Sequence, residues 1–135
     1  MTNIDDLHAG QELPELTKEP SIPQLFRYSA VTWNAHRIHY DADHAREEGH
    51  PNILVQAHLH GAVIQELLMD WLGADGKLTD LSWRNVGRAT PDSDLHVGAE
   101  VTTVDADAGV VELEVWTRTD AERCAEGVAA VELFD

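Results

Sequence analysis

Side chains that can move protons gather in one segment of this 135-residue chain. Six of its eight histidines lie between positions 36 and 60, and the run NAHRIHYD occupies residues 34–41. Histidine changes charge near neutral pH, so it serves readily as a general acid or base. Polar segments that join secondary-structure elements are common places for functional sites. The run therefore predicts acid–base chemistry, with one histidine acting on water or on a substrate proton.

The same histidines also allow a metal site, and this alternative needs several ligands to converge. His36 and His39, together with His58 and His60, could bring imidazoles together. A zinc site needs three or four ligands, however, and the H-x-x-H and H-x-H spacings arise easily by chance in a histidine-rich stretch. We therefore expect no metal. A purely structural role for any one of these histidines stays open.

The charge balance excludes several classes of partner. Lys and Arg number 9 against 25 Asp and Glu, which gives a formal net charge of −16. Nucleic acids and anionic membrane surfaces both require a basic patch, so we expect neither as a partner. No apolar run approaches the ~18 residues that span a bilayer, and the first ten residues do not resemble a signal peptide. These features predict a soluble, cytoplasmic protein with a packed core.

The apolar spacing predicts one long helix after the histidine-rich run. Leu59, Val63, Leu67 and Trp71 recur at four-residue steps over residues 57–72, and Gly73 follows. Few polar positions remain in this segment, so most of the helix circumference should be buried.

The period of the apolar pattern then changes to two, which predicts strands over residues 78–89, 95–105, 110–119 and 121–134. Before the long helix, residues 26–33 have the composition of a strand, and Asp41 is a candidate cap for a short helix over 41–48. Three prolines make residues 1–25 an extended arm. Together these elements predict an α+β fold, with a single domain over residues 26–135.

The run RYSAVTWNAHRIHYD, residues 27–41, resembles the hydratase motif of the MaoC-like, hot-dog-fold enoyl-thioester hydratases and dehydratases. The most similar branch holds 3-hydroxyacyl-thioester dehydratases and mesaconyl-CoA-type hydratases. The resemblance continues through EGHP at residues 48–51 and covers residues 26–134. It implies a hot-dog fold, in which a curved antiparallel sheet wraps one long central helix. It also implies a homodimer or a higher hot-dog oligomer, with a heteromeric hot-dog partner as a second option.

The resemblance further implies a reaction and the residues that carry it. The family adds water reversibly across the 2,3-double bond of an enoyl-CoA or enoyl-carrier-protein thioester, usually giving the (R)-3-hydroxyacyl thioester, with no cofactor. His39 matches the catalytic histidine of the family, and Asn34 stands where the commoner pattern D-x-N-P-x-H has an aspartate. Asparagine can hold a water but cannot take its proton. His39 is therefore expected to be the main base, with His36 assisting it or fixing the loop.

The enolate that forms in such a reaction also needs hydrogen-bond donors. Amide groups at a helix N-terminus provide them together with a favourable dipole. Gln56 and Ala57 open the long helix where many relatives have His-Gly, and the Ala57 amide is the candidate oxyanion donor. Arg37 and Tyr40 are further candidates for substrate binding. An acyl group with a second carboxylate, such as mesaconyl, would favour Arg37.

A coenzyme A substrate would need a local basic patch, because CoA is anionic and the chain is acidic. Arg84 and Arg88 are the candidates, and a strand period of two would place them on one face.

Two alternatives to a hydratase belong to other functional classes, a thioesterase and a non-catalytic partner subunit. Thioesterases of the same fold often use a carboxylate and a helix N-terminus, and the histidine-rich motif favours a hydratase over them. Non-catalytic partner subunits of heteromeric hot-dog hydratases tend to lose the motif, whereas this chain keeps residues 34–41. Both remain alternatives to the leading prediction of an enoyl-thioester hydratase or dehydratase.

Overall fold

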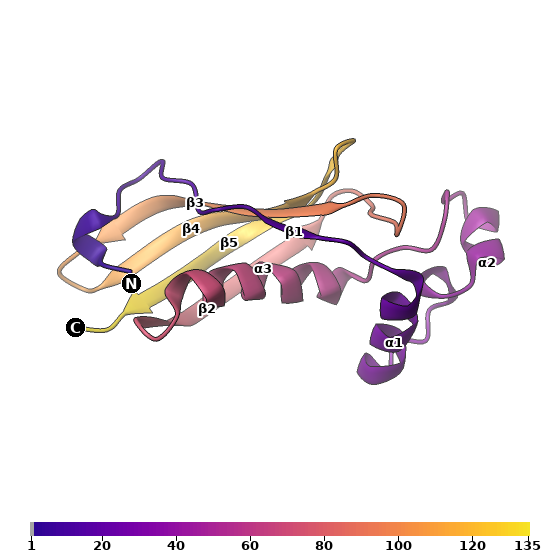
Figure 1. Cartoon of the computed structure of the whole chain (residues 1–135), viewed down its shortest axis with the longest axis horizontal. Helices are drawn as coiled ribbons and strands as arrows, with labels where there is room; N and C mark the ends of the chain where they lie inside the picture. The colour runs from indigo at the N-terminus through magenta and orange to yellow at the C-terminus, as the bar shows by residue number, and fades with distance from the viewer. Residues whose placement is uncertain (1) are drawn as a thin grey trace.

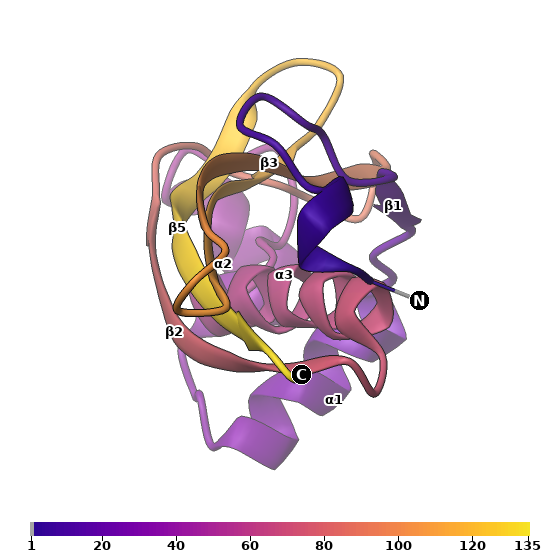
Figure 2. The same ribbon diagram turned by 90° about the vertical axis from the view of Figure 1, so that its left-hand side faces the viewer.

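A single antiparallel sheet curves around one helix in the computed structural model, which describes residues 2–135. The strand order is β1-β3-β4-β5-β2. Figure 1 shows the sheet lying along helix α3, and the end-on view in Figure 2 shows it bending round the helix. The strands are β1 (Leu16–Lys18), β2 (Gly76–Asn85), β3 (Leu95–Asp105), β4 (Val110–Arg118) and β5 (Arg123–Leu133). The predicted α+β arrangement of one wrapped helix is confirmed.

Helix α3 (Ala57–Leu72) has the bounds that the apolar period predicts. Leu59, Val63 and Leu67 are buried, whereas Trp71 at the end of the stripe is only partly buried. The sheet supplies the opposing apolar face, since alternate residues of β4 point toward the helix and are buried. Helix and sheet thus enclose one hydrophobic core, which holds the N-terminal end of α3 in place.

The N-terminal end of α3 is also tied to the edge strand β2. A Cβ atom at Gly61 would collide with the indole ring of Trp83, so only glycine lets this ring lie against the helix. From there the Trp83 Nε1 donates a hydrogen bond to the Ala57 carbonyl oxygen at 3.1 Å. The first turn of α3 and strand β2 therefore form one rigid edge.

The expected strand over residues 26–33 is wrong, because this segment belongs to helix α1 (Ile22–Thr32). The Ser21 side chain caps the helix by accepting a hydrogen bond from the Gln24 amide at 3.2 Å, and Pro23 lies in the first turn. Leu25 and Ser29, one helical turn apart, are the buried residues of α1. The capping signals outweigh the β-propensity of the aromatic and β-branched residues. Helix α1 begins at residue 22, inside the expected arm.

Short elements connect α1 to α3. They are the 3-10 turn η2 (Arg37–His39) and helix α2 (Ala42–Glu47), and a further 3-10 turn, η1 (Ile4–Asp6), lies near the start of the chain. Asp41 caps α2 as predicted, with its Oδ1 accepting from the His44 amide at 3.1 Å. The expected arm is partly ordered, because β1 pairs with β3. No helix in residues 2–135 is long and apolar enough to cross a membrane.

Candidate active site

His39 is a buried histidine whose orientation is set by the backbone. Its side chain is 8% exposed, and its Nδ1 lies 2.7 Å from the Leu54 carbonyl oxygen. A carbonyl only accepts, so Nδ1 carries the proton and Nε2 keeps a free lone pair. Burial lowers the pKa of His39, the bond to Leu54 partly opposes this, and the charge of His36 lowers the pKa slightly further. The imidazole is therefore neutral at pH 7 and can accept a proton at Nε2.

The carbonyl that orients His39 is itself held by backbone hydrogen bonds. The Leu54 amide donates to the Ile38 carbonyl at 2.8 Å, and the Val55 amide donates to the Ala89 carbonyl at 2.9 Å. The segment leading into α3 thus lies between η2 and the β2–β3 connection. Because these contacts come from three separate parts of the chain, the orientation of His39 depends on the assembled fold.

His36 lies beside His39 and is hydrogen-bonded to Asn34, so the structure brings the motif residues into one loop. The rings of His36 and His39 are 6.0 Å apart, and the His36 Nδ1 accepts from the Ile38 amide at 3.3 Å, which caps η2. The Asn34 Oδ1 accepts from the His36 amide at 3.3 Å. Among residues 2–135, the side-chain NH2 group of Asn34 has no hydrogen-bond partner. Asn34 can therefore donate to a bound molecule, and His36 fixes the loop.

An apolar pocket of about 210 Å³ opens beside Asn34. It is lined by Phe26, Ser29, Ala30, Trp33, Asn34, Ala35 and Tyr40. The Tyr40 hydroxyl donates to the Ala35 carbonyl at 2.9 Å, which closes the loop around the pocket. Trp33 is 91% exposed and adopts the left-handed conformation, with φ of 59°. The sequence did not predict that α1 lines this pocket, because residues 26–33 were expected to form a strand. The capping pattern of Ser21 and Pro23 was the signal that could have predicted the helix.

Gln56 and Ala57 are adjacent in sequence but differ in exposure. The Gln56 side chain is fully buried and donates to the Leu25 carbonyl and to the Ser29 hydroxyl, so the structure places it inside the protein. Ala57 is exposed at the first position of α3. Among the described contacts its amide N–H donates to no protein group. A hollow of about 390 Å³ opens beside it, lined by Ala57, His58, Ser82, Trp83, Arg84 and Asn85.

The two arginines proposed for CoA do not share a strand face. Strand β2 ends at Asn85, so Arg88 lies in the following connection, where it donates to the Gly49 carbonyl at 3.2 Å and contacts the His50 Nδ1 at 3.1 Å. Arg84 stays at the end of β2. The expectation of one shared face is wrong because the strand stops before Arg88.

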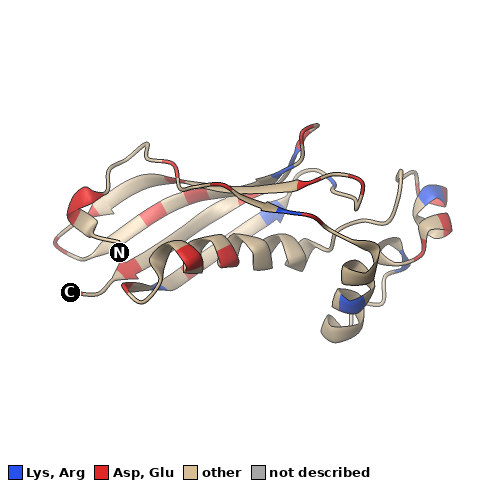
Figure 3. Cartoon of the chain, viewed as in Figure 1, with Lys and Arg blue, Asp and Glu red and all other residues tan. Residues whose placement is uncertain are grey.

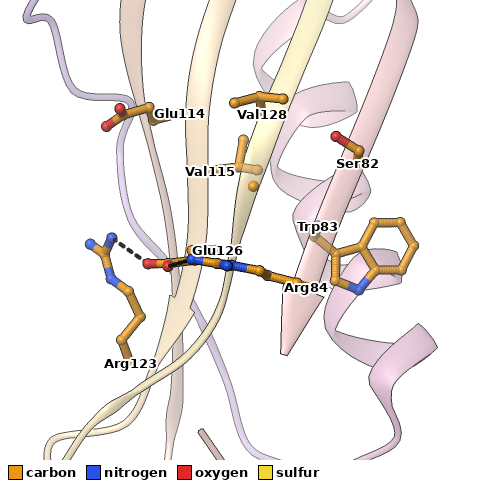
Figure 4. A pocket seen from close by; sticks show the side chains of 9 residues that line it. Ser82, Trp83, Arg84, Glu114, Val115, Arg123, Glu126 and Val128 are labelled. Atoms are coloured by element: carbon orange, nitrogen blue, oxygen red, sulfur yellow. Dashed lines mark hydrogen bonds and ion pairs between the residues drawn. The ribbon is translucent and has the colours of Figure 1, made fainter. Parts of the chain in front are cut away.

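Arg84 belongs to a small ionic group on the sheet. Figure 4 shows Glu126 between Arg84 and Arg123, with N···O distances of 3.1 and 3.7 Å respectively. These side chains line a hollow of about 530 Å³, together with Glu114 and Val128. Arg37 also has a carboxylate partner, since its Nη2 lies 2.7 Å from Asp41 and lowers the pKa of that carboxyl. Both arginines are exposed, so each can exchange its partner for a ligand.

The histidines considered for a metal site do not converge. His60 is buried, its Nδ1 lies 2.8 Å from the Thr117 hydroxyl, and burial lowers its pKa to about 4. His58 is exposed and its ring stands edge-on to Trp83. Over residues 2–135, no group of three or more His, Cys, Asp or Glu is placed to hold a metal ion.

Comparison with known proteins settles the family. Residues 6–91 match the model of a family described as hydroxyacyl-thioester dehydratase type 2, and this span covers more than half of the chain. It includes Asn34, His39 and Ala57. The chain belongs to this family. The predicted hydratase and dehydratase family is confirmed.

Individual relatives of this dehydratase-family chain agree with its fold. The mesaconyl-C(4)-CoA hydratase of Chloroflexus aurantiacus is 49% identical over 55 residues, which are 40% of this chain and 18% of that protein. The chain thus spans less than a fifth of the length of this curated relative. The (R)-hydratase from A. caviae involved in PHA biosynthesis superimposes with a TM-score of 0.87, at 20% identity, over 96% of this chain and 98% of that one. A chain of the ChsH1-ChsH2 complex from Mycobacterium tuberculosis superimposes with a TM-score of 0.85, at 20% identity, over 94% of this chain and 98% of that one. These likenesses confirm the hot-dog fold.

Proposed function

We propose that this dehydratase-family chain adds water reversibly to the 2,3-double bond of an enoyl thioester, giving the (R)-3-hydroxyacyl thioester. The observation that carries the proposal is the hydrogen bond from the His39 Nδ1 to the Leu54 carbonyl, because it leaves Nε2 of a neutral imidazole as a base. The A. caviae relative is an (R)-hydratase, which supports this choice of product.

The proposed reaction uses one water and returns every proton to the substrate. The Asn34 NH2 group holds the water, His39 Nε2 removes a proton from it, and the oxygen forms a bond to C3 of the enoyl group. The electron pair of the double bond moves toward the thioester, whose oxygen becomes an enolate oxygen held by the Ala57 N–H. His39 then gives its proton to C2, which restores the neutral base. These groups suffice for the reaction, so we propose that it needs no cofactor.

The charge distribution supports a CoA or carrier-protein thioester. Although the net charge is −16, Figure 3 shows most Lys and Arg residues toward the end that carries α1 and α2, and acidic residues predominating at the other end. Arg84 is exposed and lines the hollow that opens beside Ala57, so it can contact an anionic group of a bound thioester. We propose that Arg84 releases Glu126 to bind a CoA phosphate.

The apolar pocket favours an uncharged acyl group. None of the seven residues that line it is cationic, and Arg37, the candidate for a second carboxylate, is not among them. We propose that a short or medium alkyl chain binds between Phe26, Ala30 and Trp33. A mesaconyl-type acyl group is the second candidate, because the C. aurantiacus relative is named for that substrate.

We also propose that the chain works as a homodimer. Strand β2, ten residues long, forms one edge of the sheet, and an unpaired edge of this length tends to pair with another chain. Exposed apolar side chains on α1, such as Phe26 and Val31, give a second surface that a partner could cover. Sedimentation velocity measures the oligomeric state directly.

The testing experiment follows the absorbance of the conjugated enoyl thioester after the protein is added to crotonyl-CoA, at low and high salt. We expect the absorbance to fall without release of free thiol, and the fall to disappear with His39→Ala. Thiol release would identify a thioesterase. Activity only after addition of a second hot-dog chain would identify a partner subunit.

A further inference from the structure

We infer that Gln56 is a positioning residue, which acts through Ser29 to hold helix α1 and the first turn of α3 in one fixed arrangement. The inference rests on the proposed hydratase function, since it concerns the relative placement of Asn34 and the Ala57 amide.

Gln56 stands at the N-cap position of α3 but does not cap it. Residues that cap a helix usually accept a hydrogen bond from the second or third amide of the helix, and the Gln56 side chain makes no such bond. It reaches instead to α1, where its Nε2 donates to the Leu25 carbonyl at 2.7 Å and to the Ser29 Oγ at 2.9 Å. Since the Leu25 carbonyl can only accept, the amide nitrogen must face α1. Both amide hydrogens are therefore used inside the protein.

The two partners of Gln56 are the two buried residues of α1. Leu25 is 0% exposed and Ser29 is 6% exposed, whereas most of the helix faces outward. Figure 1 shows α1 beyond the end of the sheet, near the first turn of α3. Leu25 packs in the hydrophobic core, and the two hydrogen bonds of the fully buried Gln56 amide add a directional constraint on the orientation of α1.

Ser29 connects Gln56 to Asn34 in the motif. Its carbonyl accepts a hydrogen bond from the Asn34 amide at 2.9 Å, in the six-to-one pattern that closes a helix, and Trp33 supplies the left-handed residue. Ser29 thus bonds to Gln56 through its hydroxyl and to Asn34 through its backbone. On the other side, Gln56 is followed directly by Ala57. One buried amide therefore links the residue proposed to hold water to the amide proposed to hold the enolate oxygen.

The far side of the Gln56 amide has an unused acceptor. The Gln56 Oε1 and the His60 Nε2 are the two buried side-chain atoms in residues 2–135 that lack a hydrogen-bond partner. Gln56 is the N-cap residue of α3, and His60 lies one helical turn further along. An unpaired buried acceptor is costly, so Gln56 occupies this position at some cost to stability. A role in positioning explains why an amide, and not an apolar side chain, occupies it.

The test compares Gln56→Leu with Gln65→Leu, which removes an exposed glutamine from the same helix. With crotonyl-CoA, we expect Gln56→Leu to lower kcat about tenfold while KM stays within about threefold, because misplacing reacting groups lowers the rate more than binding. Gln65→Leu should match the wild type. Ser29→Ala should lower kcat by a smaller factor. The Ser29→Ala and Gln56→Leu effects should not multiply in the double variant, because both remove the same hydrogen bond.

Three results would overturn the inference: a kcat within twofold of wild type in a folded Gln56→Leu protein, a rise in KM as the main effect, or effects of the two substitutions that multiply. If Gln56→Leu does not fold, Ser29→Ala alone decides the question, and an unchanged kcat overturns the inference. If the wild type shows no hydratase activity, the link is measured by amide hydrogen exchange. Faster exchange of the Leu25 and Asn34 amides in Gln56→Leu, but not in Gln65→Leu, supports it, and equal exchange contradicts it.

Discussion

The His39 Nδ1 lies 2.7 Å from the carbonyl oxygen of Leu54, a residue that precedes the long helix by only a few positions. This one contact sets the tautomer of the imidazole, and the Leu54 amide in turn donates to the Ile38 carbonyl. The proposed base and the segment that leads to the proposed oxyanion donor are therefore held by the same short stretch of backbone.

The first prediction concerns His39 itself. His39→Ala removes the only proposed base, so we expect kcat for crotonyl-CoA hydration to fall by about 10²-fold or more, within the usual range for general-base catalysis. His8→Ala, which removes an exposed histidine from the N-terminal segment, is the matched control and should retain wild-type kcat. Circular dichroism checks that both variants are folded. A folded His39→Ala protein with normal turnover would exclude His39 as the base.

A second prediction follows from the lowered pKa of His39. Because the base must be neutral, kcat/KM should fall as the pH is lowered. The midpoint of this fall should lie below pH 6.5, which is the ordinary pKa of histidine. His36→Gln removes a nearby positive charge that disfavours protonation of His39. The midpoint of the acid-side fall in kcat/KM should therefore move upward in this variant, toward pH 6.5. Initial rates between pH 4.5 and 8 give both profiles. An acid limb above pH 6.5 in the wild type would contradict the proposed state of His39.

A third prediction isolates the Ala57 N–H. Proline is tolerated at the first position of a helix, and Gln56 already has the extended conformation that a residue before proline requires, with φ of −64° and ψ of 145°. Ala57→Pro should therefore fold normally but lose the oxyanion donor, which lowers kcat by about 10²- to 10³-fold. Ala57→Gly keeps the N–H and serves as the control. Equal kcat values for the two folded variants would rule out this donor.

A fourth prediction concerns stability and the buried His60. Its pKa is about 4 in the folded protein and about 6.5 when unfolded, so the unfolded chain binds a proton first as pH falls. The free energy of unfolding should therefore be greatest above pH 6.5 and decline through the window from 6.5 to about 4. At pH 5 the loss due to this group is about 2 kcal/mol.

Urea unfolding at pH 7.5 and pH 5 measures this loss. His60→Gln should reduce the difference between the two pH values, whereas His58→Gln, which replaces an exposed histidine, should leave it close to that of the wild type. If His60→Gln keeps the full wild-type difference, burial of His60 is not the source of the acid sensitivity.

A fifth prediction tests the apolar pocket as the acyl site. Ala30→Leu narrows the pocket, so kcat/KM should fall more for 2-octenoyl-CoA than for crotonyl-CoA. Ala62→Leu, at an exposed position of α3, should change neither value. A preference of the wild type for mesaconyl-CoA over both substrates would favour the dicarboxylic alternative. An equal effect of Ala30→Leu on both chain lengths would place the acyl group elsewhere.

The apolar period of the sequence predicted the elements that pack along the core. The bounds of α3 and of β3 agree with the predicted ranges, because alternating or four-residue apolar spacing is what burial of one face requires. The strand predicted from the composition of residues 26–33 was wrong, because only Leu25 and Ser29 of α1 are buried and the helix depends on its Ser21 cap. The period of two was wrong at the end of β2, where the chain leaves the sheet before Arg88.

The sequence by itself indicated the proposed type of chemistry, because Asn34, His36 and His39 stand close together in a segment that resembles a hydratase motif. It also determined the one-helix, curved-sheet architecture through its apolar periods. Only the tertiary structure decided the state of each group: the bond to Leu54 that orients His39, the burial of Gln56 against α1, and an Ala57 N–H with no partner among residues 2–135. The physical reason is that segments distant in sequence bury these groups and supply their hydrogen-bond partners. A local sequence pattern does not specify which distant segments will lie beside it.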